Sequence, residues 1–455
     1  MTENFSRGYI YKGSEKFTFC YENGILTLVS FNENSKPSDD YFGKPENIKY
    51  FEGYTLYHHY IAFYIDNNVR RYNGSYRCRP RCVILSKVQG LDFSDYNFGS
   101  VCIEGGIINS FYSNHRIISF DDVWKQKYDF ISKSREETIS RESVDLNGIN
   151  TEFELSISPF VWMYNDFNAP CKTGNSFLEV KYPNGRIYKE IIEDLIKIKD
   201  FFDFCANLKN YCFDNISLLK IDNTGNKSKI ADIIIPSMPK TDDEGLYVLN
   251  YDLFSGKLNK VFEFFNKSKY IFSTISEDNV ARNRFDNHKL CAVISCFQSI
   301  RRIVYKNIDK EIKTKDEIAL DEVKQDVLPI LETVLANYTG RKRKCLRSFI
   351  NMIEKSDFNL EKSVCMEFRA NGYLLEVLHP DVKKAIEKKG IEDSINYVIK
   401  KRDCITHEDI VDLDDILEGV YQIIYRLNYI MILTYAGIDK SKIKAIIFKL
   451  AGKSL

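Results

Sequence analysis

Residues 416–431 read ILEGVYQIIYRLNYIM, and this stretch decides how the second half of the chain folds. Its apolar residues recur every three or four positions, which is the spacing of one face of an α-helix. So wide an apolar face predicts a long helix in a helical core. Tyr421, Tyr425 and Tyr429 form a row off the main apolar stripe. This row either packs within one chain or faces a second copy.

Four further apolar stripes of helical period precede this stretch, and each is wide enough to bury one face. They occupy residues 290–304, 323–335, 346–353 and 391–399. Short connections favour antiparallel packing of such helices. Residues 281–455 contain two of the ten prolines and carry 31 basic against 26 acidic residues. This part therefore predicts an all-α helical bundle.

The first part of the chain is typical of a β-rich domain. Glu22-Asn23-Gly24 separates two apolar runs and signals a hairpin. Further runs rich in aromatic and β-branched residues lie at 54–64, 82–85, 101–108 and 153–157. Turn glycines separate them, as in a sandwich or barrel-like sheet. A helical period interrupts the pattern at 187–202, and a short β segment follows at 230–236.

The predicted fold class is therefore α+β and multidomain. Residues 1–240 form a β-rich sandwich or barrel-like domain, 241–280 a connector with some helix, and 281–455 a helical bundle. The chain has 455 residues, 64 basic and 64 acidic, so its formal net charge is zero. This balance excludes a protein whose whole surface is basic, and any nucleic-acid site must be a local patch.

Neither a membrane span nor a secretory leader is predicted. No apolar run reaches 18 residues, and the first residues lack the pattern of a signal peptide. We therefore expect a cytoplasmic protein without membrane contact, whose twelve cysteines are mostly buried free thiols. Cys78 and Cys82 have no metal-ligand partners nearby in sequence, so no metal and no cofactor are expected.

Residues 399–407, IKKRDCITH, are the strongest candidate for chemistry. Arg402 follows Val398 by four positions, which places it on the apolar face of the fourth stripe. A guanidinium there needs a partner, such as Glu408, or a function. His407 follows shortly before the long helix, for which Asp412 is the expected N-cap with Asp415 at N3. A cation, an imidazole and a helix N-terminus together suit a phosphodiester.

Arg402-Asp403 followed by His407 resembles the R-x4–6-H signature of the HEPN superfamily, which also lies between two long helices. A β-rich part before such a bundle resembles the ApeA-type anti-phage HEPN proteins of bacteria. The resemblance implies a metal-independent endoribonuclease acting as a toxin in abortive infection. His407 would be the general acid or base, Arg402 would neutralise the phosphorane, and Asp403 would orient them. The implied products are a 2′,3′-cyclic phosphate and a 5′-hydroxyl.

The resemblance also implies partners. These are RNA, a second copy bound through the helical bundle, and a phage-derived trigger acting on the N-terminal domain. Whether tRNA, rRNA or messenger RNA is cut stays open. Two residues depart from the usual family pattern: Asp403 stands where Asn is more frequent, and Gln298 stands where relatives often carry Glu. Both departures favour the alternative, a non-catalytic RNA- or protein-binding module. Arg282 and His288 also satisfy the motif and form a competing pair.

Two basic segments are further candidates for binding RNA. The first has five cations within seven residues at a helix start, and its members are Arg341, Lys342, Arg343, Lys344 and Arg347. These residues either grip an RNA backbone or form a solvated helix face. The second interleaves arginines at 70, 71, 77, 79 and 81 with Tyr72 and Tyr76. It is more typical of a hairpin with solvated arginines than of a stacking platform. His58 and His59 are expected within a strand, as structural residues on opposite faces.

Overall fold

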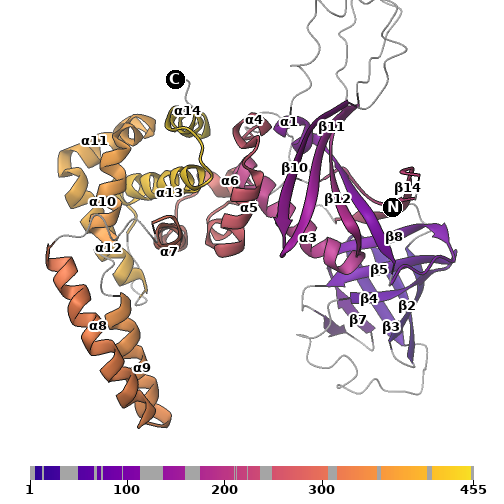
Figure 1. Cartoon of the computed structure of the whole chain (residues 1–455), viewed down its shortest axis with the longest axis horizontal. Coiled ribbons are helices and arrows are strands. Elements are labelled where there is room, and N and C mark those ends of the chain that lie inside the picture. The colour runs from indigo at the N-terminus through magenta and orange to yellow at the C-terminus, as the bar shows by residue number, and fades with distance from the viewer. Residues whose placement is uncertain are drawn as a thin grey trace, which may run out of the picture. The chain divides into compact units, whose positions relative to one another are not determined.

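The computed structural model divides the chain into two compact units, Met1–Phe262 and Glu263–Leu455 (Figure 1). The boundary falls within the stretch expected as a connector. The structure describes residues 6–12, 15–30, 50–65, 69–72, 75–94, 96–112, 137–158, 175–209, 211, 213–222, 224–235, 248–305, 315–355, 360–406 and 412–451. Its class is α+β, with a large antiparallel sheet in the first unit and helices in the second, as the sequence predicts.

The first unit is built on one antiparallel sheet of fourteen described strands. Their order across the sheet is β10-β11-β12-β9-β13-β14-β8-β5-β4-β1-β2-β3-β7-β6. The strands are β1 Arg7–Lys12, β2 Glu15–Glu22, β3 Ile25–Ser30, β4 Tyr50–Thr55, β5 His59–Ile65, β6 Arg70–Tyr72, β7 Ser75–Cys78, β8 Pro80–Gln89, β9 Asn97–Glu104, β10 Glu137–Leu146, β11 Ile149–Ser158, β12 Asn175–Ile187, β13 Asn215–Ile221 and β14 Lys227–Ile234.

Two hairpins follow directly from turn chemistry. β2 and β3 are joined by Asn23 and Gly24, with φ of 51° and 74°, as the Asn-Gly signal predicts. β10 and β11 are joined in the same way by Asn147 and Gly148, with φ of 56° and 80°. Both central residues of such a turn need positive φ, which Asn and Gly adopt most easily.

Of the sandwich or barrel-like sheet that the sequence predicts, the sandwich is not formed, because the described strands belong to one continuous sheet. β8 pairs with β5 on one side and with β14 on the other, so it joins the two halves of the sheet. The half from β8 to β7 encloses an apolar core in which Phe19 and Phe63 pack edge to face, their ring centroids 5.3 Å apart. Because a long shared strand carries the hydrogen bonds from one half to the other, the described strands do not separate into two sheets.

The aromatic run at 54–64 is a hairpin and not one strand. β4 ends at Thr55 and β5 begins at His59, and His58 adopts φ of 59° in the turn between them. His58 is exposed, whereas the Nδ1 of His59 lies 3.0 Å from the carbonyl oxygen of Ser86. His59 is thus held within the sheet, whereas the expectation that both histidines lie within a strand is wrong for His58.

One face of the other half of the sheet packs against helices. These are α1 Gly106–Phe111, α3 Tyr188–Ala206, α4 Tyr251–Phe254 and α5 Leu258–Lys267. Phe201 of α3 packs against Phe111, Phe254 and Phe262, with ring centroids 5.3 to 5.6 Å apart. The opposite face bears charged residues, including Glu154, Glu179 and Lys181. This alternation is typical of an antiparallel sheet with one covered face.

The helical unit contains nine described α-helices, from α6 to α14, and all five apolar stripes fall in helices. The elements are α6 Asn279–Asn283, α7 Asn287–Val304, α8 Lys315–Ala336, α9 Gly340–Lys355, α10 Leu360–Ala370, α11 Pro380–Lys389, α12 Ile391–Thr406, α13 Asp415–Tyr435 and α14 Lys440–Leu450, with 3-10 turns η5 Tyr270–Ser273 and η6 Gly372–Val377.

Helix α13 lies at the centre of this unit and packs against α7, α11, α12 and α14 (Figure 1). Its apolar stripe is buried as predicted, from Leu417 to Leu433. Asn428, fully buried, donates a hydrogen bond of 3.1 Å from Nδ2 to the carbonyl oxygen of Val293 in α7. This bond fixes how α13 lies along α7, because a buried amide must find an acceptor.

Helices α8 and α9 depart from the expectation that every stripe is buried in the bundle. They pack chiefly against each other as a helical hairpin. Leu335 and Ile350 are buried between them, but the side chains of Val323 and Ile330 are 56% and 62% exposed. Periodicity predicts that a face is apolar without saying what covers it.

Candidate functional site

Arg402 lies in the last turns of α12, on the face of the helix that packs into the core. Ile395 and Val398, seven and four residues earlier, are fully buried. Arg402 is half-buried and its Nε is shielded from solvent. The helix thus carries a guanidinium from the apolar core toward the surface, as its spacing from Val398 predicts.

The other two members of the expected catalytic set are not described. Asp403 belongs to α12, but its side chain lies outside the described residues, as do the whole of His407 and Glu408. Among the described residues, Arg402 and its neighbours at the junction between α12 and α13 define the site.

The start of α13 corrects the expected N-cap. Asp414, and not Asp412, caps the helix, because its Oδ1 accepts a hydrogen bond of 2.8 Å from the backbone N–H of Leu417. Asp415 and Glu418 add two more acidic residues in the first turn. These carboxylates complement the helix dipole and satisfy its N–H groups. These carboxylates would repel a phosphate at this terminus, which makes it a less favourable phosphate site than the sequence suggests.

Cations and one tyrosine surround the end of α12. Tyr397 donates a hydrogen bond of 2.7 Å to Oδ2 of Asp414. That bond, followed by burial, raises the pKa of Tyr397 to about 12. The Nζ atoms of Lys389 and Lys401 lie 3.8 Å and 5.7 Å from the centre of the Tyr397 ring. The junction thus offers positive charge beside an aromatic face, a combination that suits a nucleotide.

The competing pair lies on neighbouring short elements and is accessible. Arg282 is in the last turn of α6, His288 is in the first turn of α7, and both are exposed. Lys289, the residue after His288, donates hydrogen bonds to the carbonyl oxygens of Ala281 and Arg284. Burial lowers the pKa of Lys289, although Asp286 opposes that effect. A lysine thus ties α6 to α7 at this place, which gives the segment a structural role.

Gln298 and the tyrosine row lie within the helical unit. Gln298 is half-buried on α7. Tyr421 packs against Phe285 with ring centroids 5.0 Å apart, and Tyr429 is fully buried. Tyr425 lies between the other two tyrosines, and its ring centroid is 6.1 Å from that of Tyr421 and 5.6 Å from that of Tyr429. The row thus packs within the chain through Tyr421 and Tyr429, while Tyr421 and Tyr425 remain half-buried.

The predicted RNA-binding cations occupy the first two turns of α9. All five are exposed, and they are Arg341, Lys342, Arg343, Lys344 and Arg347. Three of them line a shallow hollow of about 460 Å³ together with Ser348 and Asn351. Five cations within seven residues surround nearly the whole circumference of a helix, because each residue turns the chain by about 100°. No acidic residue lies in this first turn.

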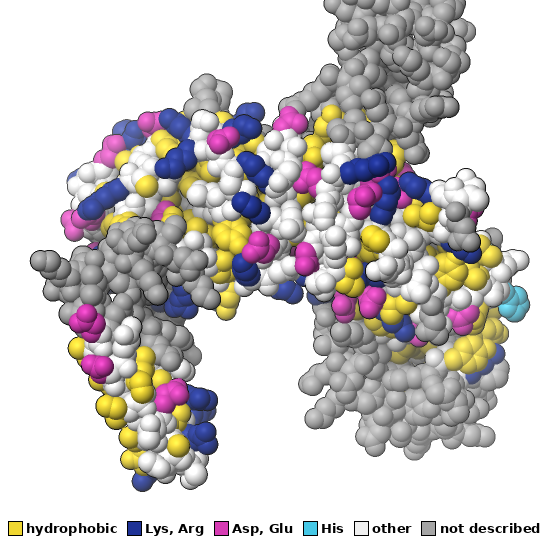
Figure 2. All heavy atoms as spheres, viewed as in Figure 1, with side chains coloured by type: hydrophobic (Ala, Val, Ile, Leu, Met, Phe, Trp, Pro, Cys, Tyr) yellow, Lys and Arg dark blue, Asp and Glu magenta, His cyan; other side chains and the backbone are white. Residues whose placement is uncertain are grey.

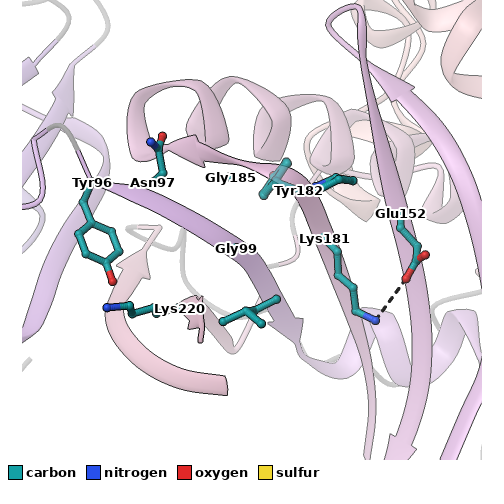
Figure 3. Close-up of a pocket in the computed structure, with 10 residues that line it drawn as sticks. Tyr96, Asn97, Gly99, Glu152, Lys181, Tyr182, Gly185 and Lys220 are labelled. Carbon is teal, nitrogen blue, oxygen red and sulfur yellow. Dashed lines mark hydrogen bonds and ion pairs between the residues drawn. The ribbon is translucent and has the colours of Figure 1, made fainter. Parts of the chain in front are cut away.

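A groove on the sheet of the first unit was not predicted from the sequence. It has a volume of about 600 Å³ and is lined by residues of β9, β11, β12 and β13 (Figure 3). Lys220 lies over the ring of Tyr96, its Nζ 5.6 Å from the ring centre. Lys181 forms ion pairs with Glu152 and Glu154, so its charge is already balanced. Strands distant in sequence form this groove, and no single segment signals it.

Three further observations bear on the sequence expectations. Cys78 and Cys82 are buried, and burial raises the pKa of both thiols, so neither thiol is activated. Within the described part of the chain, no three His, Cys, Asp or Glu side chains gather closely enough to hold a metal ion. Among the described helices, none combines the length and apolar character needed to cross a membrane.

No family model, curated protein or solved structure matches this chain.

Proposed function

We propose that this chain is an endoribonuclease that cleaves RNA at the junction of α12 and α13, with Arg402 and His407 as its catalytic pair. The observation that carries the proposal is the setting of Arg402. Its side chain is half-buried, its Nε is shielded, and Lys400 and Lys401 precede it directly. The R-x4-H spacing from Arg402 to His407 supports the same assignment.

The proposed reaction needs one proton shuttle and one fixed cation. His407 takes the proton of a ribose 2′-hydroxyl, whose oxygen bonds to the adjacent phosphorus. The bond from phosphorus to the 5′-oxygen breaks, and an imidazolium returns a proton to that oxygen. Arg402 balances the charge on the phosphorane, and a guanidinium shielded from water does so more effectively than an exposed one. DNA is inert because it lacks the 2′-hydroxyl.

Substrate binding in this proposal is electrostatic. The exposed cations of α9, centred on Arg343, Lys344 and Arg347, hold the RNA backbone without reading its sequence. Lys389, Lys401 and the ring of Tyr397 hold the nucleotide beside the scissile phosphate, by charge and by stacking. The acidic start of α13 sets the limit of this positive surface.

Such an activity needs restraint, since unrestrained RNA cleavage would stop growth of the cell that makes it. We assign that restraint to the first unit, in keeping with anti-phage defence by abortive infection. The groove beside Tyr96 and Lys220 is the place on this unit where a small triggering ligand would fit. Its Tyr96 ring and the adjacent ammonium of Lys220 together suit a planar anionic ligand.

A second candidate function is RNA or protein binding without cleavage. It is favoured by the carboxylates of Asp414, Asp415 and Glu418 at the start of α13, which disfavour a phosphate there. Gln298 favours it too, since a glutamine cannot act as a proton acceptor in catalysis. In this case the cations of α9 bind the RNA and the junction is structural.

The test is cleavage of an end-labelled RNA by the full chain in the presence of EDTA. We expect Arg402→Ala and His407→Ala each to lower the rate by at least about 100-fold, the scale of a lost acid–base catalyst. His288→Ala is the matched control, since His288 is exposed on α7 and follows the competing Arg282. Full activity in the Arg402→Ala/His407→Ala double variant would remove the proposal. RNA binding without cleavage by the wild type would support the second function.

A further inference from the structure

Helix α8 carries an apolar stripe that no described part of the same chain covers fully. Val323, Val327, Ile330 and Val334 are spaced by four, three and four residues, which is the heptad spacing of a coiled-coil seam. Val323 and Ile330 are the most exposed members, and Val327 and Val334 are half-buried. We call this stripe the outer seam.

The outer seam is distinct from the contact between α8 and α9. That contact uses the next row of α8, where Leu335 is buried and Leu328 and Leu331 are half-buried. On α9, Ile350 is buried while Phe349 remains 47% exposed. Figure 2 shows yellow side chains along this hairpin with dark-blue ones beside them. A row of exposed apolar residues at regular spacing marks an interaction surface, unlike the scattered apolar residues of an ordinary surface.

The two helices of the hairpin carry opposite charge. The sequence of α8 has six acidic and two basic residues, whereas that of α9 has six basic and one acidic residue. Glu322 and Asp326, both exposed, flank the outer seam. One hairpin therefore presents both halves of a complementary surface. A twofold axis would place the acidic helix of one copy against the basic helix of the other, as an isologous interface requires.

We infer that the α8–α9 hairpin is a dimerisation arm whose occupant is the same hairpin of a second copy of this chain. Four helices then form an antiparallel bundle, and the outer seam of each α8 packs against α9 of the other copy. A basic partner of another kind would satisfy the charge of α8 but would leave Arg341 and Lys342 of α9, which lie away from the proposed RNA-binding side, unmatched. The second copy satisfies both helices at once.

This inference does not depend on RNA cleavage. Because the five cations surround α9, Arg341 and Lys342 can face the other copy while Arg343, Lys344 and Arg347 remain in solvent, where RNA reaches them. The arm also specifies where a second copy binds, which the proposed catalytic site alone does not specify. His407→Ala is therefore expected to dimerise like the wild type even though it loses cleavage.

The experiment measures the mass of the full chain by sedimentation equilibrium over a range of concentrations. We expect a dimer for the wild type. In Val323→Glu/Ile330→Glu the dissociation constant is expected to rise by about 100-fold or more, since carboxylates would enter a desolvated seam. Both positions are exposed in one chain, so the fold should persist, and circular dichroism checks this. Val280→Glu is the matched control, because Val280 is 80% exposed on α6.

A charge exchange tests the pairing of α8 with α9. Glu322→Lys/Asp326→Lys reverses the two acidic residues that flank the outer seam of α8, and Arg341→Glu/Lys342→Glu reverses two cations of α9. Each variant alone should dimerise more weakly than the wild type, and an equimolar mixture should recover the dimer as a heterodimer. A wild type that is monomeric throughout, or a Val323→Glu/Ile330→Glu variant that loses RNA binding while the dimer persists, overturns the inference. Failure of the mixture to recover the dimer overturns the α8–α9 pairing.

Discussion

Tyr397 of α12 and Asp414, the residue that caps α13, are joined by a hydrogen bond of 2.7 Å. The other oxygen of the same carboxylate accepts from the backbone N–H of Leu417 at 2.8 Å. One side chain thus holds the first turn of α13 and fastens it to α12, five residues before Arg402. The position of Arg402 relative to α13 depends on this carboxylate.

Replacing Asp414 by Ala should therefore loosen the junction. We expect the free energy of unfolding of the helical unit to fall by about 1–2 kcal/mol for the lost cap. The lost hydrogen bond from Tyr397 adds about 1 kcal/mol. Denaturant unfolding measures the loss, and amide hydrogen exchange over residues 415–420 locates it.

The chain offers a matched control for this change. Asp439 precedes α14 in the same position, but its side chain makes no capping hydrogen bond. Asp439→Ala should cost clearly less than Asp414→Ala, and Tyr397→Phe should lose only the bond to Asp414. Equal losses at Asp414 and Asp439 would contradict the dual role of the Asp414 carboxylate.

The sequence predicts features that depend on neighbouring residues. Asn23-Gly24 gives its hairpin because two adjacent residues supply both positive φ values, and the stripe of α13 gives a buried helix because its whole face is apolar. His58 was missed because a histidine at positive φ carries no sequence signal. Asp414 was missed because Asp412 and Asp415 lie beside it, and composition does not choose among three aspartates.

Features that depend on distant segments could not be predicted. The groove beside Tyr96 and Lys220 forms where β9 lies between β12 and β13, an order that follows from the whole sheet. Helix α8 was predicted from its period, but the period does not tell whether the apolar face meets its own chain. The position of Arg402 was predictable because Val398 precedes it by one helical turn.

Gly419 is required by close packing between α13 and α11. A Cβ at this position would lie 2.7 Å from Cγ1 of Val382 and closer still to Ile386. Gly419→Ala should lower the free energy of unfolding by about 1–3 kcal/mol, the usual cost of overpacking. Gly372→Ala is the control, because a Cβ there meets no atom within 4 Å. If denaturant unfolding shows no change in the free energy of unfolding for Gly419→Ala, α11 can move away from α13 without cost.

Glu154 makes the first unit sensitive to acid. Burial alone would raise the pKa of this carboxyl, but hydrogen bonds from Lys181 and Arg141 outweigh burial and hold the pKa below its ordinary value of 4.5. The folded chain therefore keeps Glu154 charged where the unfolded chain would be protonated. The contribution of this charged carboxylate to the stability of the fold is therefore present above pH 4.5 and is lost as the pH falls through the folded pKa.

Glu154→Gln tests this dependence. At neutral pH the variant should lose about 1.5–3 kcal/mol, the scale of a hydrogen bond to a charged group. The free energy of unfolding of the variant should also change less between neutral pH and pH 3 than that of the wild type. The sheet signal in circular dichroism measures the unfolding. Glu152→Gln, at the more exposed partner of Lys181 (Figure 3), is the control and should change little. If the stability of the wild type and that of Glu154→Gln fall in parallel as the pH is lowered, Glu154 is not the group that makes the first unit sensitive to acid.

The cations of α9 should set the salt dependence of RNA binding. If Arg343, Lys344 and Arg347 each contact a phosphate, replacing all three by Gln should reduce the slope of log affinity against log salt by about 2, at about 0.7 per contact on a single strand. The affinity should fall uniformly for RNAs of different sequence, because phosphate contacts carry no base information. Lys383→Gln/Lys384→Gln/Lys388→Gln on α11 removes the same charge elsewhere and should leave the slope unchanged. Equal changes from both triple variants would mean that net charge, and not the surface of α9, attracts the RNA.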